Sequence, residues 1–266
     1  MCKPPVWKIL LCLWEFDAWR LLPSLLKQKQ PVRYLPMYLA HRRQFIAKGG
    51  RVDQLFPILQ DFSDNAGNAR GHYFHQDLLV SALIHEARPT RHIDVGSRID
   101  GFVAHVAAFR EIEVVDVRPL ADSGHRNIRF LRADLMDERN APKEIADSVS
   151  CLHAIEHFGM GRYSEPIDPD GHLKGFVNLV RMLKPGGTLY ISFPIAAQTH
   201  TCFNAHRVFE AKEILTWPTG GRKLELLRFD HVDDAGELHH DVDLSAARLS
   251  PKYGCGIYVF RKPLDT

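Results

Sequence analysis

The strongest constraint on the fold of this 266-residue chain is an alternation, from residue 91 onward, of short strand-like runs with helix-like runs. Seven strands are expected: Arg91–Val95, Ile112–Asp116, Ile128–Leu131, Ser148–Leu152, Thr188–Phe193, Leu224–Phe229 and Gly256–Arg261. Helices are expected between them near Phe102–Phe109, Lys143–Ala146, Leu173–Leu183 and Glu210–Thr216. This order predicts a doubly wound, mostly parallel α/β sheet. No convincing helix separates the last two strands, which is compatible with an antiparallel final strand.

The first 70 residues differ from this pattern. They contain short helical stretches interrupted by prolines, and they end in a turn-rich run at residues 64–68. Residues 1–51 carry ten lysines and arginines but only two acids, whereas the remainder carries 24 basic and 30 acidic residues. We therefore predict a basic, helical extension over residues 1–70 and an α/β domain over residues 71–266, which opens with a helix near Tyr73–Ala87.

Apolar residues recur at helical spacing between Trp7 and Leu25, which predicts an amphipathic helix. The longest wholly apolar run in this stretch, Ile9–Trp14, is too short to span a bilayer. The helix can pack on the protein's own body or lie on a membrane surface, so peripheral membrane contact through residues 1–51 is an open expectation. Five scattered cysteines without C-x-x-C spacing favour a cytoplasmic location.

Acidic or polar residues follow four consecutive expected strands. Asp94 and Gly96 end the first strand, Asp116 ends the second, Asp134 follows the third, and a cluster at residues 153–157 follows the fourth. Open α/β sheets bind ligands at the carboxyl ends of their strands, so these residues should converge. A carboxylate such as that of Asp116 can accept both hydroxyls of a ribose. The set predicts a site for an adenosine-containing ligand.

A nicotinamide cofactor is the first alternative for such a site. Its fingerprint is G-x-G-x-x-G. Here Gly96 and Gly101 enclose Ser97 and Arg98, so the middle glycine is missing. An acid two residues before the first glycine suits instead a ligand with a cationic amino-acid end. A nucleotide-binding module of the oxidoreductase type remains the alternative interpretation.

The strand-tip residues resemble the successive motifs of the class I S-adenosylmethionine-dependent methyltransferases. The segment Leu-Lys-Pro-Gly-Gly-Thr at residues 183–188 resembles their "LKPGG" signature. This resemblance spans about residues 72–261 and implies a seven-stranded Rossmann-like methyltransferase sheet with S-adenosylmethionine as cofactor. More narrowly, residues 92–103 and 203–207 are similar to a bacterial domain family of unknown function that is linked to surface-polysaccharide loci.

The resemblance also implies roles for individual residues. The methionine end of the cofactor would lie at the loop after the first strand, the ribose at Asp116 and the adenine at Asp134. The residues implied in cofactor binding are Asp94, Gly96, Ser97, Asp116, Asp134, Leu135, His153 and Glu156. Arg98 and Asp100 stand where the family carries further loop glycines. A non-catalytic scaffold that retains the fold is therefore the second alternative.

Methyl transfer to a hydroxyl needs alignment and a base that takes the proton. Histidine suits that task near neutral pH. We expect His157 to be the base, supported by His206, and the acceptor to be a hydroxyl of a small or glycan-linked molecule. His206 and Arg207 can equally brace the next element. The loop over residues 159–171 is expected to form part of the acceptor pocket.

Residues 153–157 also match H-x-x-E-H, the inverted zinc-protease motif. That chemistry needs both histidines on one helix, whereas a strand precedes this segment. A metal held by Glu156 and His157 stays open by similarity to ubiquinone-pathway O-methyltransferases, but no metal site is predicted. Nucleic acid is not an expected partner, because the chain lacks the Asn/Asp-Pro-Pro-aromatic tetrapeptide and any basic stripe beyond the N-terminal arm.

Overall fold

The computed structural model describes residues 31–246 and 249–264. The chain divides into two compact units, Met1–Asn68 and Ala69–Thr266. The described part of the first unit contains η2 (Val32–Tyr34), α3 (Leu35–Ala47) and η3 (Gln60–Phe62). The amphipathic helix expected between Trp7 and Leu25 lies outside the described residues. Among the helices that are described, none has the length and hydrophobicity to cross a membrane.

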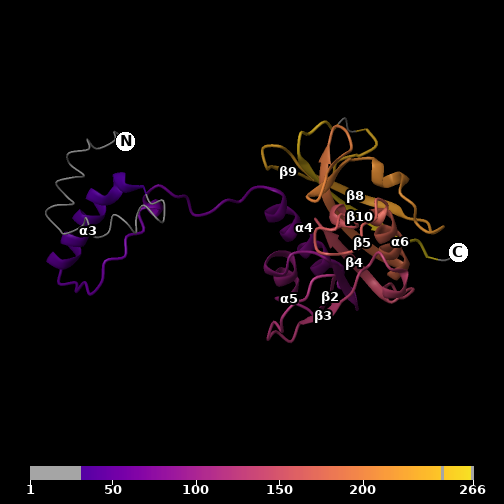
Figure 1. Ribbon diagram of the computed structural model, residues 1–266, viewed down its shortest axis with the longest axis horizontal. Helices are drawn as coiled ribbons and strands as arrows, with labels where there is room; N and C mark the ends of the chain where they lie inside the picture. The colour runs from indigo at the N-terminus through magenta and orange to yellow at the C-terminus, as the bar shows by residue number, and fades with distance from the viewer. Residues whose placement is uncertain (1–30, 247–248, 265–266) are drawn as a thin grey trace. The chain divides into compact units, whose positions relative to one another are not determined.

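The second unit is built on one mixed sheet with the order β3-β2-β1-β4-β5-β10-β8-β9, and the strands labelled in Figure 1, all of these except β1, follow this order from one edge to the other. The strands of this path are β1 (His92–Val95), β2 (Ile112–Asp116), β3 (Ile128–Arg132), β4 (Ala146–Leu152), β5 (Leu183–Ala196), β8 (Glu225–Val232), β9 (Leu238–His239) and β10 (Gly254–Arg261). Strands β1 to β5 pair in parallel, whereas β10 is antiparallel to both β5 and β8. The predicted doubly wound, mostly parallel sheet with an antiparallel last strand is confirmed, but the sheet has ten strands in the described residues instead of seven, because three short strands were not expected.

Helices cover both faces of this sheet. Figure 1 shows α4 (His72–Ala87) and α5 (Ala104–Ala107) on one side and α6 (Gly171–Met182) on the other. The hydrophobic core is accordingly split in two. One cluster joins α4 and α5 to the sheet, and the other joins α6 to it. Strands β1 and β4 are buried almost throughout because both of their faces are covered.

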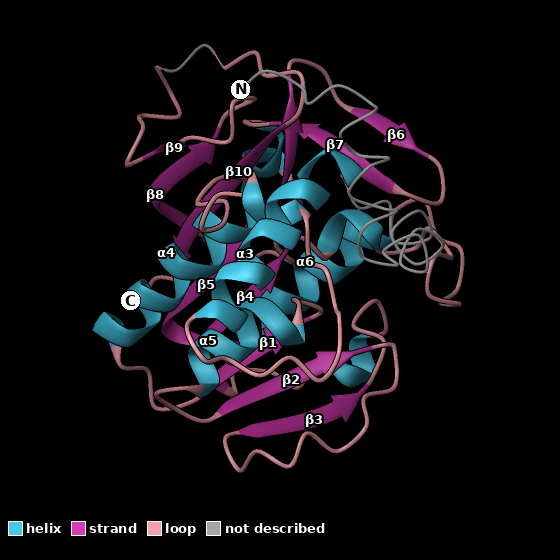
Figure 2. Cartoon of the chain, turned by 90° about the vertical axis from the view of Figure 1, so that its left-hand side faces the viewer, coloured by secondary structure: helices cyan, strands magenta, loops and turns pink. Residues whose placement is uncertain are grey.

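Two predicted helices are absent. At residues 143–146, Glu144 has φ +56°, and the backbone N–H groups of Glu144 and Ile145 donate to carbonyls at the end of α6, so Ala146 already begins β4. Glu210 ends the additional strand β7 (His206–Glu210) rather than starting a helix, which leaves only the single turn η7 (Glu213–Thr216). Strand β7 pairs with β6 (His200–Cys202) and with β5, as Figure 2 shows.

Three short helical turns lie at or near the carboxyl ends of the parallel strands: η4 (Ile99–Val103) after β1, η5 (Glu138–Asn140) after β3 and η6 (Ile155–His157) after β4. Because β1 to β4 pair in parallel, the residues that follow these strands meet at one edge of the sheet.

Candidate functional site

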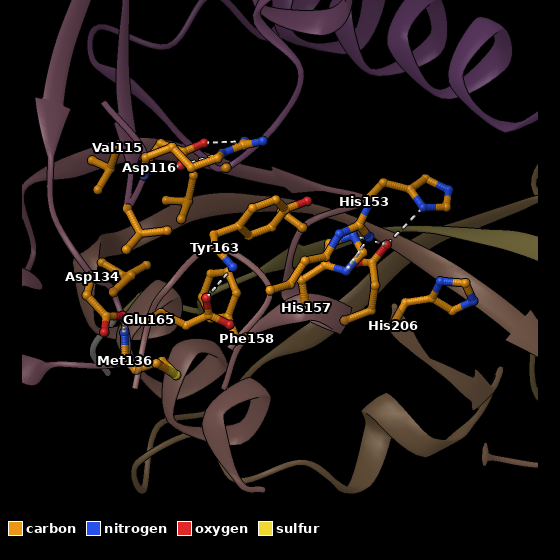
Figure 3. Close-up of a pocket in the computed structure, with 18 of the residues that line it drawn as sticks. Val115, Asp116, Asp134, Met136, His153, His157, Phe158, Tyr163, Glu165 and His206 are labelled. Atoms are coloured by element: carbon orange, nitrogen blue, oxygen red, sulfur yellow. Dashed lines mark hydrogen bonds and ion pairs between the residues drawn. The ribbon is translucent and has the colours of Figure 1, made fainter. Parts of the chain in front are cut away.

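A pocket lies at this edge and is lined by residues that follow β1, β2, β3 and β4 in turn (Figure 3). Tyr73 of α4, Tyr253 immediately before β10 and His206 of β7 complete its wall. Eight of the ten predicted site residues line it: Gly96, Asp116, Asp134, Leu135, His153, Glu156, His157 and His206. The predicted convergence of four strand ends is thus present in the structure.

Asp94 and Ser97 do not line the pocket. Asp94 is fully buried beneath the loop, where its Oδ1 accepts hydrogen bonds from the hydroxyls of Ser97 and Ser150, each at 2.6 Å. Its Oδ2 accepts from the backbone N–H of Ser97 at 3.2 Å. Burial raises the pKa of Asp94 to about 7 despite these hydrogen bonds. The carboxyl group therefore holds the loop in place, and its predicted role in cofactor binding stays a prediction.

Gly96 makes the turn that this loop requires. Its φ is +74°, and a Cβ at this position would lie 2.9 Å from Cβ of Ala154. Any other residue would therefore be strained and would press on the loop after β4. The turn brings bare backbone to the pocket wall.

Asp116 at the tip of β2 is engaged by its own neighbour. Nε of Arg118 donates to Oδ1 at 2.9 Å, Nη2 donates to Oδ2 at 2.5 Å, and the backbone N–H of Arg118 donates to Oδ1 at 2.8 Å. The guanidinium carbon lies 4.5 Å from the ring centroid of Tyr163, which is a cation–π contact. Both carboxylate oxygens thus already accept hydrogen bonds at the place where a ribose is expected.

The turn after β3 is pinned to α6. Oδ1 of Asp134 accepts from the backbone N–H of Met136 at 2.9 Å, and the side-chain amide of Asn178 donates to the carbonyl of Leu135 at 2.8 Å. These bonds fix Asp134 and Leu135 against the pocket.

The segment after β4 places a buried carboxyl group in the pocket. Glu156 is 1% exposed, and its Oε1 lies 3.0 Å from Nδ1 of His153 and 3.7 Å from Nε2 of His157. Its Oε2 has no hydrogen-bond partner among the described residues. An unpaired, buried carboxylate oxygen is costly, and a cationic ligand would relieve that cost.

His157 is held in one tautomer. Its Nδ1 lies 2.7 Å from the carbonyl oxygen of Ala205, which can only accept, so Nδ1 carries the proton. In the neutral ring Nε2 is then the basic nitrogen. Burial lowers the pKa of His157, so the ring is neutral at physiological pH and ready to take a proton.

His206 also lines the pocket, with its ring centroid 6.4 Å from that of His157 and 5.6 Å from that of Tyr253. Burial lowers its pKa as well.

The adjacent Arg207 acts as a brace. Its guanidinium donates to the carbonyls of Phe158 at 2.7 Å and of Pro169 at 3.0 Å, at the two ends of the inserted loop, residues 159–170.

This loop, residues 159–170, contributes Arg162, Tyr163 and Glu165 to the pocket. The carboxylate of Glu165 accepts from the backbone N–H groups of Gly161 at 2.7 Å and Tyr163 at 2.8 Å, as Figure 3 shows for Tyr163. Hydrogen bonds between residues of the loop itself therefore stabilise its conformation, and they hold Tyr163 beside the pocket.

Sequence reasoning missed Tyr73, Tyr253 and the pairing of Arg118 with Asp116. The two tyrosines come from α4 and from the segment before β10, which no motif connects with the strand tips. The spacing of Arg118, two residues after the acid, is the one signal that would have suggested the ion pair.

Comparison with known proteins bears on the fold. The family model described as "Caenorhabditis protein of unknown function, DUF268" matches residues 123–217, about a third of the chain. No curated protein matches the sequence. Because the matching description names Caenorhabditis, the predicted link to a bacterial polysaccharide-locus family stays a prediction.

Several solved structures are similar to the chain. The [4+2]-cyclase SpnF matches with a TM-score of 0.53 and 16% identity, over 75% of this chain and 86% of its own. A candidate sarcosine dimethylglycine methyltransferase from Galdieria sulphuraria matches with a TM-score of 0.51 and 17% identity, over 84% and 97%. The fold is the Rossmann-like methyltransferase fold. Since one of these two proteins is described as a cyclase, the fold by itself does not determine the reaction.

Proposed function

We propose that this chain is an S-adenosylmethionine-dependent methyltransferase that methylates a hydroxyl of a small or glycan-linked acceptor. The observation that carries the proposal is the convergence of Gly96, Asp116 and Asp134 on one pocket. These three residues offer a backbone turn, a two-oxygen acceptor and a second carboxyl group from three successive strand ends.

The residues present fit this cofactor. Gly96 has φ +74° and turns bare backbone to the pocket wall, and the unpaired Oε2 of Glu156 suits the positive charge of a sulfonium or an α-amino group. Asp116 would hold the ribose, and Asp134 with Leu135 would hold the adenine. The cofactor supplies an electrophilic methyl group, and the protein supplies alignment and proton removal.

His157 supports O-methylation. Its Nδ1 is anchored on the carbonyl of Ala205, so its neutral ring carries the lone pair on Nε2, which lies 3.7 Å from Oε1 of Glu156, and the residue lines the pocket. A group of this kind accepts the proton of an acceptor hydroxyl. Tyr73, Tyr163 and Tyr253 supply flat apolar surfaces, and Arg162 supplies a charge, which together suit a sugar ring or an aromatic ring.

One observation favours the non-catalytic scaffold instead. Both carboxylate oxygens of Asp116 already accept hydrogen bonds from Arg118. If this ion pair persists, a ribose has to share the carboxylate with Arg118, because only Oδ2 accepts a single hydrogen bond, and the hold on an adenosyl group is weaker.

Calorimetric titration of the full chain with S-adenosylmethionine and S-adenosylhomocysteine separates these possibilities. We expect binding of both compounds, a loss of more than tenfold in affinity for Asp116→Asn, and unchanged affinity for the control Asp122→Asn, which alters an exposed acid that does not line the pocket. NAD⁺ is the reference ligand for the oxidoreductase alternative. If the folded protein binds neither adenosyl compound, the methyltransferase proposal is wrong.

A second measurement tests the acceptor class. Wild-type protein and His157→Ala are incubated with methyl-labelled cofactor and a panel of hydroxyl- and amine-bearing acceptors, including sugars. We expect label on hydroxyl acceptors, and a large loss of turnover in the variant with cofactor affinity retained. Transfer to amines alone would contradict O-methylation and leave cofactor binding intact.

A further inference from the structure

Three side chains from distant parts of the sequence meet beside the pocket. His72 is the first residue of α4, His153 follows β4, and Cys255 is the second residue of β10. One ligand atom from each lies within 4.8 Å of the other two. Cys255 is completely buried, and the side chain of His153 is 4% exposed.

The ring of His153 supplies a second, independent observation. Its Nδ1 is paired with Oε1 of Glu156 at 3.0 Å, whereas its Nε2 is buried without a hydrogen bond of good geometry in the described part of the chain, and the thiol of Cys255 is an interacting neighbour of the ring. A buried imidazole nitrogen without a partner loses its interaction with water and gains nothing in return. A carboxylate on one imidazole nitrogen and a vacant second nitrogen form the arrangement in which histidine ligates metal ions in proteins.

His72 is positioned by rings on both sides. Its centroid lies 5.2 Å from that of His153 and 5.3 Å from that of Tyr253. The backbone of Tyr253 is a hydrogen-bond partner of its imidazole. This contact occupies one side of the ring and fixes its orientation, as an outer partner does for a metal-bound histidine.

A nucleophilic role for Cys255 does not explain the cluster. The residue is completely buried, and its sulfur contacts the side-chain carbonyl of Gln76 at 3.9 Å and the carbonyl of Gly256 at 3.6 Å. A nucleophilic thiol needs an open path to its substrate, and this residue has no exposed surface. A small ion can reach the three side chains from the pocket, because His153 lines it.

We propose that His72, His153 and Cys255 bind a divalent transition-metal ion, and that the ion is Zn²⁺. Two imidazole nitrogens and one thiolate form a donor set that zinc prefers. Three protein ligands leave a fourth tetrahedral position for a water molecule or for an oxygen of a bound molecule. His153 and Tyr253 line the pocket, so the ion would lie at the wall of the proposed acceptor region.

This site differs from the one that the H-x-x-E-H motif suggests. Nδ1 of His157 is used by the carbonyl of Ala205, and η6 is a single turn, so His153 and His157 do not form a pair of ligands on one helix. Glu156 acts through His153 by orienting its ring.

The test uses the untagged full chain, since a polyhistidine tag would itself bind metal. Zinc is titrated in competition with a chromophoric chelator, and Co²⁺ is then substituted for it. We expect one equivalent of metal and a cobalt–thiolate charge-transfer band. The band should disappear in Cys255→Ser and persist in Cys202→Ser, which alters an exposed cysteine of β6.

Two further variants cover the case in which Cys255→Ser does not fold. His72→Gln removes a ligand at a partly exposed position and should weaken zinc binding more than tenfold. Glu156→Gln weakens the orienting contact and should cost about 10–100-fold in affinity. Substoichiometric zinc in the wild type, or an unchanged cobalt band in Cys255→Ser, overturns the proposal. Because these titrations contain no adenosyl compound, their failure is distinct from a failure of the proposed methyltransferase function.

Discussion

Arg118 holds Asp116 through both oxygens of its carboxylate and stacks its guanidinium on Tyr163. Asp116 is only 9% exposed, so this ion pair is shielded from solvent on the carboxylate side. A ribose that binds at β2 has to displace Arg118 or share Asp116 with it. Arg118 therefore competes with the ligand for the carboxylate of Asp116.

Removing this competitor should strengthen binding. In Arg118→Ala the carboxylate of Asp116 becomes free, and we expect S-adenosylhomocysteine to bind about two- to fivefold more tightly, in line with the ~0.5–1 kcal/mol of a partly exposed ion pair. Calorimetry measures the change. Arg129→Ala, which breaks an exposed pair with Glu111 away from the pocket, is the matched control and should leave the affinity unchanged. Weaker binding in Arg118→Ala would mean that Arg118 itself contacts the ligand.

The turn at Gly96 should tolerate no side chain. Gly96→Ala combines a left-handed backbone with a Cβ contact at 2.9 Å, whereas Gly124→Ala has φ +66° and open space around the new methyl group. Both variants should lose about 1 kcal/mol from backbone strain, and Gly96→Ala should lose about 1–3 kcal/mol more. Urea unfolding measures this difference. Equal destabilisation of the two variants would show that the Ala154 contact is relieved without cost.

Burial of Asp94 predicts a pH dependence of stability. Its pKa in the folded protein is about 7, compared with about 4 in an unfolded chain, so the folded state binds the proton more tightly. The free energy of unfolding should therefore fall as pH rises between those two values, by up to about 4 kcal/mol from this group alone. Asp94→Asn should reduce that slope, and Asp100→Asn should not. Urea unfolding at pH 5 and pH 8 measures this change in the free energy of unfolding. An equal change in the wild type and in Asp94→Asn would contradict the raised pKa of Asp94.

Arg207 should hold the inserted loop closed. Arg207→Met leaves the carbonyls of Phe158 and Pro169 without their donor, so we expect faster hydrogen–deuterium exchange across residues 159–170 and a loss of about 1–3 kcal/mol in stability. Arg222→Met, at an exposed turn, is the control. Unchanged exchange in the loop would show that Glu165 alone suffices to order it.

The architecture could be predicted because its signal is local. Strands such as β2 and β4 are short apolar runs bounded by polar turns, and this pattern survives in the fold. The helix expected at residues 143–146 failed because its backbone groups find partners at the end of α6, a contact that no window of sequence contains. β7 was missed for the same reason, since it pairs with the far end of β5.

The sequence could predict only those pocket residues that lie at or directly after the ends of the parallel strands. Gly96, Asp116 and Asp134 follow their strands directly, so their convergence follows from parallel pairing. Burial was not predictable: Asp94 lies beside Ser150 in the register of β1 and β4, which turns its carboxyl group away from the pocket. His72 and Cys255 belong to elements that precede and follow the parallel strands, and only the folded chain brings them to His153.

The position of β10 between β5 and β8 has a consequence for biosynthesis. The strand that joins these two neighbours is the last of the sheet to leave the ribosome, so until residue 261 has emerged both of them present rows of unsatisfied amide and carbonyl groups. The nascent protein is then most prone to aggregate, and shielding by a chaperone would matter most in that interval.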